Sequence, residues 1–174
     1  LTSLNVKNNN IVITADPAFS LIPSDNSNVF TQENIPEGEK YFAVSLREWK
    51  GHEKNFIPAT AKLCDYVNKK YGYTPIIIPM HKKLDMAVCK KLKSQISCKS
   101  YLVEGTYEAN DIINLIENCE FSMGMRLHAL IYSLSVGTPV LGLSYDPKVD
   151  SVLDSFKIDS KCKVTDIDEA TAMK

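Results

Sequence analysis

The sequence predicts an α/β fold, a doubly wound and mostly parallel sheet of the Rossmann-like type. Three observations lead to this prediction. Short β-branched runs alternate with amphipathic helical segments, the connections between them are brief, and some runs, such as residues 76–78, are apolar on both faces. A strand without a polar face is typical of a parallel sheet covered by helices on both sides. The 174 residues suffice for a single domain with its own core.

Strands are expected where β-branched and aromatic residues cluster between turn-forming residues. Residues 11–14 form the first such run, which ends at an Ala-Asp-Pro sequence. Residues 20–40 are rich in Pro, Asn, Ser, Gly and Asp, so we expect a long surface loop there. Further runs follow in regular order, at residues 41–46, 74–79, 101–103, 120–122, 139–143 and 162–164.

Helices are expected where apolar residues recur with the helical period. Within residues 84–96, for example, Leu84, Val88, Leu92 and Ile96 share one face. The same kind of spacing recurs in the other segments between strands, at residues 56–71, 108–117, 126–136, 148–156 and from 166 onward. In a doubly wound sheet, ligands bind beyond the carboxyl ends of the strands, so functional side chains are expected directly after strands.

The composition excludes several classes of protein. Lys and Arg number 20 against 21 Asp and Glu, so the chain has no overall basic field of the kind that general nucleic-acid binders carry. No apolar run approaches the ~20 residues of a membrane helix. Five cysteines without C-x-x-C spacing argue against a disulfide framework and a zinc site. We therefore expect no metal and a cytoplasmic protein, with a position at the inner face of the membrane left open.

The sharpest motif is Gly-Met-Arg-Leu-His-Ala at residues 124–129. We predict that a strand ends at Gly124 and that a helix follows, with Arg126 and His128 in its first turn. Gly124 permits a tight turn, and a helix start offers unpaired N–H groups and a positive dipole end. This pattern indicates a phosphate or carboxylate site, with Arg126 as a two-pronged contact and His128 as a hydrogen-bonding or proton-transfer group. The alternative is that Arg126 is a solvated charge and His128 a packing residue.

Other charged residues also follow predicted strands. Lys148 is expected at the start of a helix, where a cation is unfavourable because the helix dipole is positive at that end. An anion bound nearby would offset this cost and explain the position of the lysine. Arg47 closes a predicted strand on the same edge of the sheet. The alternatives are a solvated Lys148 and a structural ion pair of Arg47 with Glu48 or Glu53.

Two further strand ends carry weaker candidates, and several known motifs are missing. His81 follows a strand, but a lone histidine there is more often structural, and Asp16 is explained by an Asp-Pro turn. The sequence holds no Gly-x-Gly-x-x-Gly fingerprint, no Walker motif and no Gly-x-Ser-x-Gly elbow. Dinucleotide binding, P-loop chemistry and serine-hydrolase chemistry therefore lack support.

Three segments together resemble the polysaccharide pyruvyl transferase family, which includes enzymes of the CsaB type. Residues 124–130 are similar to its G-x-R-x-H-A signature, residues 139–149 to its P-x-x-x-x-x-Y-x-x-K segment, and residues 12–19 to an A-D-P-A-F element between its two halves. Arg47 matches an arginine that closes a strand in that family, and the Pro-Met-His stretch that leads to Asp85 resembles its P-M-x…D segment. The order agrees throughout, and the resemblance spans nearly the whole chain.

The resemblance implies the carboxy-terminal half of a two-domain, GT-B-like architecture. Residues 1–174 would then form one Rossmann-like donor-binding domain, with residues 1–40 partly an inter-domain segment and loop, and the amino-terminal domain would lie outside the chain. The implied reaction transfers a pyruvyl group from phosphoenolpyruvate to a sugar of a bacterial cell-wall polysaccharide, as a ketal, with release of phosphate. The expected partners are phosphoenolpyruvate and a polysaccharide or lipid-linked glycan acceptor. No cofactor is expected, and this half alone is expected to be inactive.

By this resemblance, five residues are expected to bind the substrate: Arg126, Lys148, Arg47, Gly124 and Tyr145. Phosphoenolpyruvate carries a phosphate and a carboxylate close together, so binding it needs several cations in a small space. We hypothesise that His128 is the catalytic group, as general acid or base or as a stabiliser of the departing phosphate. Two alternatives stay open: a GT-B-like glycosyltransferase that uses a nucleotide sugar, and a non-catalytic sugar- or anion-binding module.

Overall fold

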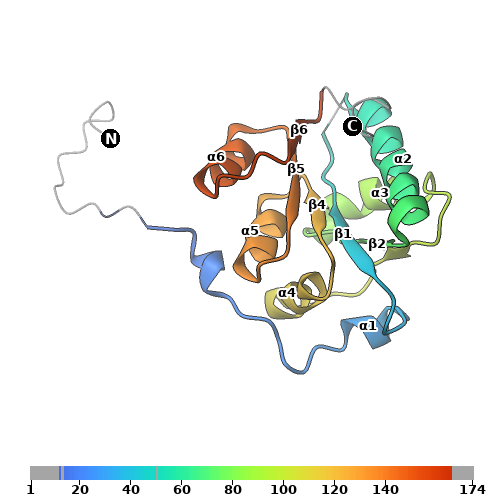
Figure 1. Cartoon of the computed structure of the whole chain (residues 1–174), viewed down its shortest axis with the longest axis horizontal. Helices are drawn as coiled ribbons and strands as arrows, with labels where there is room; N and C mark the ends of the chain where they lie inside the picture. Colours follow the sequence, from blue (N-terminus) through green and yellow to red (C-terminus); the bar gives the residue numbers. More distant parts are fainter. Residues whose placement is uncertain (1–11, 13, 50, 166–174) are drawn as a thin grey trace.

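The computed structural model describes residues 12, 14–49 and 51–165, and it shows one six-stranded parallel sheet with helices on both faces (Figure 1). The strand order is β3-β2-β1-β4-β5-β6. The strands are β1 (Tyr41–Ser45), β2 (Thr74–Ile77), β3 (Tyr101–Leu102), β4 (Ser122–Gly124), β5 (Val140–Ser144) and β6 (Lys161–Lys163). The predicted doubly wound, Rossmann-like α/β fold is therefore confirmed.

The strand order places a topological switch point between β1 and β4. The chain runs outward from β1 through β2 to β3, then returns to pair β4 with the other side of β1, with Ala43 opposite Ser122 and Ser45 opposite Gly124. In sheets of this kind, the two directions of winding leave a crevice beyond the carboxyl ends of the strands at the switch point. Residues that follow β1 and β4 are therefore the ones best placed to meet a ligand.

Helices α2 (Glu53–Tyr71) and α3 (Lys82–Lys93) cover one face of the sheet. The opposite face carries α4 (Ala109–Glu117), α5 (Leu127–Ser135) and α6 (Pro147–Ser155), as Figure 1 shows. Among the described helices, none is long and apolar enough to cross a membrane.

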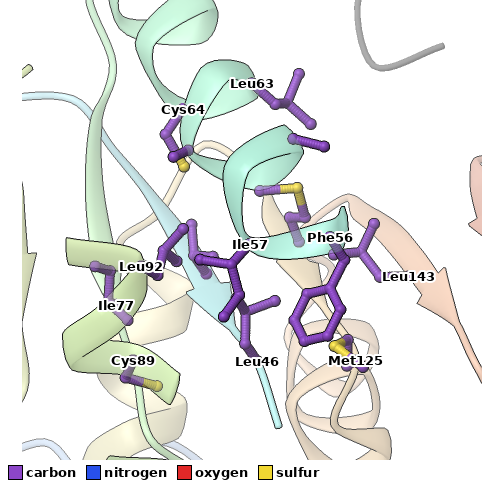
Figure 2. Packing of buried hydrophobic residues seen from close by; sticks show 14 of the residues in the cluster. Leu46, Phe56, Ile57, Leu63, Cys64, Ile77, Cys89, Leu92, Met125 and Leu143 are labelled. Atoms are coloured by element: carbon purple, nitrogen blue, oxygen red, sulfur yellow. The ribbon is translucent and has the colours of Figure 1, made fainter. Parts of the chain in front are cut away.

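The core follows from the side-chain alternation of β1. Phe42 and Val44 pack with the residues of α2 and α3, whereas Tyr41 and Ala43 pack on the side of α4. All five residues of β1 are buried, which explains why this strand has no polar face. Figure 2 shows Phe56 of α2 beside Met125, which continues β4 towards the site. Full burial of one such large apolar side chain contributes roughly 1.5–3 kcal/mol.

The segment before β1 is more ordered than the predicted loop. It contains a 3₁₀ turn, η2 (Pro17–Ser20), and a short helix, α1 (Val29–Gln32). Asp16 caps η2 by accepting a hydrogen bond from the Ala18 N–H at 2.9 Å, as expected for an Asp-Pro turn. The Phe19 ring stacks on Phe156 with centroids 5.3 Å apart, so η2 is fastened to the α4–α6 side of the sheet.

Two element predictions differ from the structure. The sequence predicts a strand at residues 11–14, but Val12 and Thr14 lie outside any strand. Residues 11 and 13 are not among the described residues. The helix expected from residue 166 onward also lies outside them. On α3, Leu84 is 54% exposed although the apolar pattern placed it on the buried face. The buried position is taken by Asp85, which is 0% exposed.

Candidate functional site

A cavity of about 300 Å³ lies at the carboxyl ends of the strands, next to the switch point. We call it the strand-end cavity. Its charged and polar lining consists of Arg47, His81, Arg126, His128, Tyr145 and Lys148. Met80, Leu127 and Tyr132 complete the wall. These six residues, all named as site candidates from the sequence, are far apart in the chain. The ends of four neighbouring strands, β2, β1, β4 and β5, bring them into one cavity.

Each of these side chains is positioned by the end of a strand or the start of a helix. Arg47 follows β1 by two residues, and Arg126 follows β4 by two residues. Arg126 is the N-cap of α5, with extended backbone angles, so the prediction that it lies within the first helical turn is wrong. Arg126 thus directly precedes the first helical residue, Leu127, whereas His128 is the second residue of α5.

Arg126 is held by the buried carboxylate of Asp85, which lies in the first turn of α3. Its Nε lies 3.1 and 2.9 Å from Oδ1 and Oδ2 of Asp85, and its Nη2 also donates to Oδ1. Asp85 in addition accepts a hydrogen bond from the His81 N–H at 2.8 Å. Arg126 is thus an ordered, charge-compensated group rather than a solvated surface charge, with its side chain 19% exposed. The guanidinium donors that do not face Asp85 remain available to a ligand.

Arg47 has a different environment on the other side of the switch point. Its Nη1 donates a 2.6 Å hydrogen bond to the Tyr145 hydroxyl, and its guanidinium carbon lies 4.9 Å from the centre of that ring. Its Nε is buried without a hydrogen-bond partner. The structure does not show the expected alternative of a pair with Glu53, which instead accepts from the Gly51 N–H at 3.0 Å. The hydrogen-bond partner of the Arg47 guanidinium is therefore a phenol hydroxyl and not a carboxylate, so its positive charge is not neutralised and can attract an anion.

His128 lies at the start of α5, exposed to the cavity. Its ring centre is 6.0 Å from that of Tyr132. Burial raises the pKa of the Tyr132 hydroxyl, and the charge of Asp16 raises it further, so this tyrosine stays protonated at neutral pH. The α5 start has no side-chain cap, so its first N–H groups add hydrogen-bond donors and the positive end of the helix dipole.

Lys148 is exposed at the second position of α6 and lines the cavity. A cation at a helix start is expected to have an anion nearby, because the helix dipole is positive at that end. Two carboxylates already supply it, because Asp146 caps the helix by accepting from the Lys148 N–H at 2.9 Å and Asp150 lies in the first turn. The position of Lys148 in the cavity, and not its opposition to the dipole, is what favours a ligand-binding role.

Gly124 does not line the cavity. It is the last residue of β4, buried within the sheet between Ser45 and Gly142. A Cβ at this position would lie 3.4 Å from the Ser45 carbonyl oxygen and 3.7 Å from the Ala129 Cβ. The structure therefore explains this glycine by close packing between strand and helix rather than by a tight turn against a ligand. Its substrate-binding role stays a prediction.

Sequence reasoning missed the partner of Arg126. Asp85 appeared only as part of a family stretch, although its position carried a signal. It is three and seven residues before Val88 and Leu92, both buried, and so occupies the apolar stripe of α3. A carboxylate there requires a cation or several donors, because an unpaired buried charge is costly. In the structure that cation is Arg126, which follows β4 by two residues.

The other hollows do not offer the same chemistry. One of about 330 Å³ lies at the amino end of β1, where Glu37 and Glu39 line it and no lysine or arginine does. Such a wall repels an anion. Within the described part of the chain, no group of three or more His, Cys, Asp or Glu side chains is placed to hold a metal ion.

A model of the family "Polysaccharide pyruvyl transferase" matches residues 1–147 of the chain. The match includes Arg47, Arg126, His128 and Tyr145 and ends one residue before Lys148. No curated protein sequence matches the chain.

Solved structures with related folds include a glycosyl transferase and two UDP-GlcNAc 2-epimerases. A family 9 glycosyl transferase from Veillonella parvula has a TM-score of 0.60 at 12% identity, over 93% of this chain and 51% of its own. The UDP-GlcNAc 2-epimerase from Methanocaldococcus jannaschii has a TM-score of 0.60 at 13% identity, over 86% and 41%. The epimerase from Neisseria meningitidis, bound to UDP-GlcNAc, has a TM-score of 0.59 at 16% identity, over 80% and 38%. The chain thus spans about half or less of each, and identities this low establish only the fold.

Proposed function

The chain belongs to the polysaccharide pyruvyl transferase family, and on that premise we propose that its strand-end cavity binds phosphoenolpyruvate and transfers the pyruvyl group to a sugar of a polysaccharide. The family supports a transferase acting in polysaccharide biosynthesis, and the donor is the further step that we propose. We also propose a cytoplasmic enzyme whose second domain, supplied by the rest of the same protein, completes the acceptor site.

The observation that carries the proposal is the convergence of Arg47, Arg126 and Lys148 on one small cavity beside a helix start. Phosphoenolpyruvate presents a phosphate ester and a carboxylate on the same carbon atom. Arginine and lysine contacts to such groups form charge-assisted hydrogen bonds, which are about twice as strong as neutral ones. Among the described residues, no aspartate or glutamate lines the cavity, and the carboxylates nearby lie behind Arg126 (Asp85) and in the first turn of α6. The cavity wall itself therefore presents cations to an anionic donor, and of these Arg47 has no carboxylate partner in the described part of the chain.

The reaction balances with the groups that the cavity supplies. Two hydroxyl oxygens of the sugar form bonds to the central carbon of the enolpyruvyl unit, and the bond from that carbon to the phosphate oxygen breaks. One hydroxyl proton is delivered to the methylene carbon, which becomes the ketal methyl group, and the other leaves with the phosphate. No oxidant or reductant takes part. Cations beside the phosphate offset the charge that develops on the departing oxygen.

His128 is the proposed proton carrier, because it is the histidine at the helix start that faces the phosphate-binding cations. It either moves a hydroxyl proton or stabilises the departing phosphate. Replacement by alanine is expected to lower turnover of the whole protein by about 10²–10⁴-fold, the usual contribution of acid–base catalysis. Since His128 is exposed, thermal unfolding is expected to change little. A fully active H128A protein contradicts this role.

The donor is tested by calorimetric titration of the chain with phosphoenolpyruvate, UDP-GlcNAc and inorganic phosphate. We expect phosphoenolpyruvate to bind more tightly than phosphate, because only it offers both anionic groups to the three cations. Lys148→Met removes an exposed cation of the cavity, and Lys93→Met removes an exposed cation of α3 outside it. The first variant should weaken phosphoenolpyruvate binding by about threefold, as for loss of one solvent-exposed charge pair, and the second should not.

The other outcomes identify the alternatives. Tighter binding of UDP-GlcNAc than of phosphoenolpyruvate assigns the cavity to a nucleotide-sugar glycosyltransferase. Equal weakening by Lys148→Met and Lys93→Met shows general charge attraction and contradicts a defined site. Tight phosphoenolpyruvate binding without ketal formation by the whole protein indicates the non-catalytic module.

A further inference from the structure

A second hollow of about 230 Å³ adjoins the strand-end cavity on the side of β2 and β3. We call it the side hollow, and the lining residues that matter here are Met80, Lys82, Thr106, Tyr107, Ile112 and Tyr132. Met80 and Tyr132 line both spaces. A ligand in the side hollow therefore lies directly beside a ligand in the strand-end cavity.

The loop that walls the side hollow is fixed from one side by Glu33. This carboxylate accepts hydrogen bonds from the Gly105 N–H at 2.6 Å, the Glu104 N–H at 3.0 Å and the Tyr107 hydroxyl at 2.7 Å. Burial raises the pKa of Glu33, but the hydrogen bonds outweigh burial and the net pKa lies below its ordinary value. Glu33 is therefore ionised at neutral pH and holds the loop in place.

The sequence of the loop fits this arrangement. A Cβ on Gly105 would lie 2.6 Å from the Tyr107 ring, so only glycine permits the ring to fold over the loop backbone. From the other side, the Lys82 ammonium donates a 3.1 Å hydrogen bond to the Thr106 hydroxyl. The wall thus consists of an aromatic ring held by a hydrogen bond, with a hydroxyl and an ammonium group at its edge. The ring packs with its inner side against the core and is only partly buried, so part of it lines the hollow.

We propose that the side hollow binds one pyranose ring of the acceptor glycan. The inference rests on the proposed function, because a ketal joins two oxygens of one sugar to the donor's central carbon, and that sugar must then lie next to the donor. Tyr107, Tyr132, Ile112 and Met80 offer apolar surface to the C–H face of the ring, while Thr106 and Lys82 offer hydrogen bonds to its hydroxyls. The small volume suits a single ring rather than a longer oligosaccharide.

A neutral sugar fits the charges better than a second anion. Lys82 is the one cation among the residues that line the hollow in the described chain, and Glu33, which lies behind the wall, is ionised and close enough to interact with it. The net field is therefore weak. Hydroxyl recognition needs no net charge, since both Thr106 and Lys82 serve as hydrogen-bond partners.

The test uses saturation-transfer NMR on the whole 174-residue chain with methyl β-glycosides of galactose, glucose and N-acetylmannosamine as probes. We expect at least one glycoside to bind through its ring protons, and more strongly once phosphoenolpyruvate is present. Thr106→Val removes only the hydroxyl at nearly constant shape, and Lys82→Met removes the ammonium group. Each should weaken the glycoside by about fivefold, as for loss of one hydrogen bond. Lys83→Met, an exposed neighbour of Lys82 that does not line the hollow, should have no effect.

The outcomes separate this inference from the proposed function. Absence of glycoside binding, or binding that Thr106→Val and Lys82→Met leave unchanged, overturns the side hollow as the acceptor site even where phosphoenolpyruvate binds. Displacement of the glycoside by uridine alone also overturns it, by assigning the hollow to a nucleobase. Glycoside binding that depends on Thr106 in a chain that does not bind phosphoenolpyruvate supports the sugar site and contradicts the donor.

Discussion

The ends of β1 and β4 both bring an arginine to the strand-end cavity, but the protein holds the two side chains differently. Arg126, after β4, is fixed on two of its nitrogen atoms by the buried Asp85. Arg47, after β1, is fixed on one nitrogen atom by the neutral hydroxyl of Tyr145 and keeps a buried Nε without a partner. One arginine is compensated before any ligand arrives, and the other is not.

The difference shows that two arginines in one cavity can have separate tasks. The Asp85 carboxylate cancels most of the long-range attraction of Arg126 for an anion but fixes the direction of its remaining donors. Arg47 retains its attraction, although a phenol constrains it less than an ion pair does. We therefore infer that Arg126 mainly orients the donor and that Arg47 mainly supplies the charge that binds it. The following variants test this division.

The largest expected effect is on stability, from Asp85→Ala. The substitution leaves the guanidinium of Arg126 half-enclosed without its carboxylate, and loss of one partner of a buried pair typically costs about 3–5 kcal/mol. Urea unfolding followed by circular dichroism measures the free energy of unfolding. The matched control is Asp154→Ala, which breaks the surface pair with Lys161 and should change stability little. Equal losses in the two variants would show that the Asp85 pair is not a structural anchor.

The second effect is on affinity, from Arg47→Met. Methionine keeps much of the aliphatic stem but removes the uncompensated charge, so phosphoenolpyruvate binding should weaken by about tenfold or more, the value of one hydrogen bond to a charged group. Calorimetric titration measures the dissociation constant, and urea unfolding should show a much smaller loss than in Asp85→Ala. If Arg47→Met binds phosphoenolpyruvate like the wild type, the charge that attracts the donor comes from elsewhere and the division of tasks is wrong.

The smallest effect is expected from Tyr145→Phe. This change removes the hydroxyl that accepts the Arg47 hydrogen bond but keeps the ring against the guanidinium. Loss of one neutral acceptor should weaken phosphoenolpyruvate binding by about fivefold, less than loss of Arg47 itself. In the double variant, Tyr145→Phe should add almost no further loss of phosphoenolpyruvate affinity to that of Arg47→Met, because the proposed role of the Tyr145 hydroxyl is to position Arg47. Additive losses would instead indicate that Tyr145 contacts the ligand directly.

Much of the fold could be predicted from sequence, because the apolar runs and helical periods are strong local signals. β1, β2 and α5 follow from such patterns, with ends that differ by at most two residues. The α1 helix could not be predicted, since its four residues carry too little periodicity and depend on burial of Val29 for their structure. Leu84 was assigned to the wrong face because a one-residue rotation of α3 separates it from Asp85, and the pattern alone does not fix that rotation.

Which charged side chains line the strand-end cavity could be predicted from the sequence, but the partners that hold them could not. Strand ends of a parallel sheet share one edge, so Arg47, Arg126 and Lys148 were expected to meet from topology alone. The Asp85–Arg126 pair joins α3 to the residue that follows β4, which come together only once the sheet order is known, and no spacing rule connects them. The role of Gly124 could not be predicted either. The motif suggested a tight turn that lets a ligand approach the backbone, whereas in the structure the glycine allows β4 to pack closely against Ser45.

The sheet order also governs how the molecule is made. β1, β2 and β3 come from contiguous sequence, but β1 pairs on its other side with β4, which is synthesised only after α4. Until then, that edge of β1 presents unpaired N–H and C=O groups to any other strand. Non-local pairing of this kind is slow and exposed to misassembly. Since the strand-end cavity straddles the junction of β1 and β4, we expect that it cannot bind a ligand before these two strands have paired, so ligand binding would report on that non-local step.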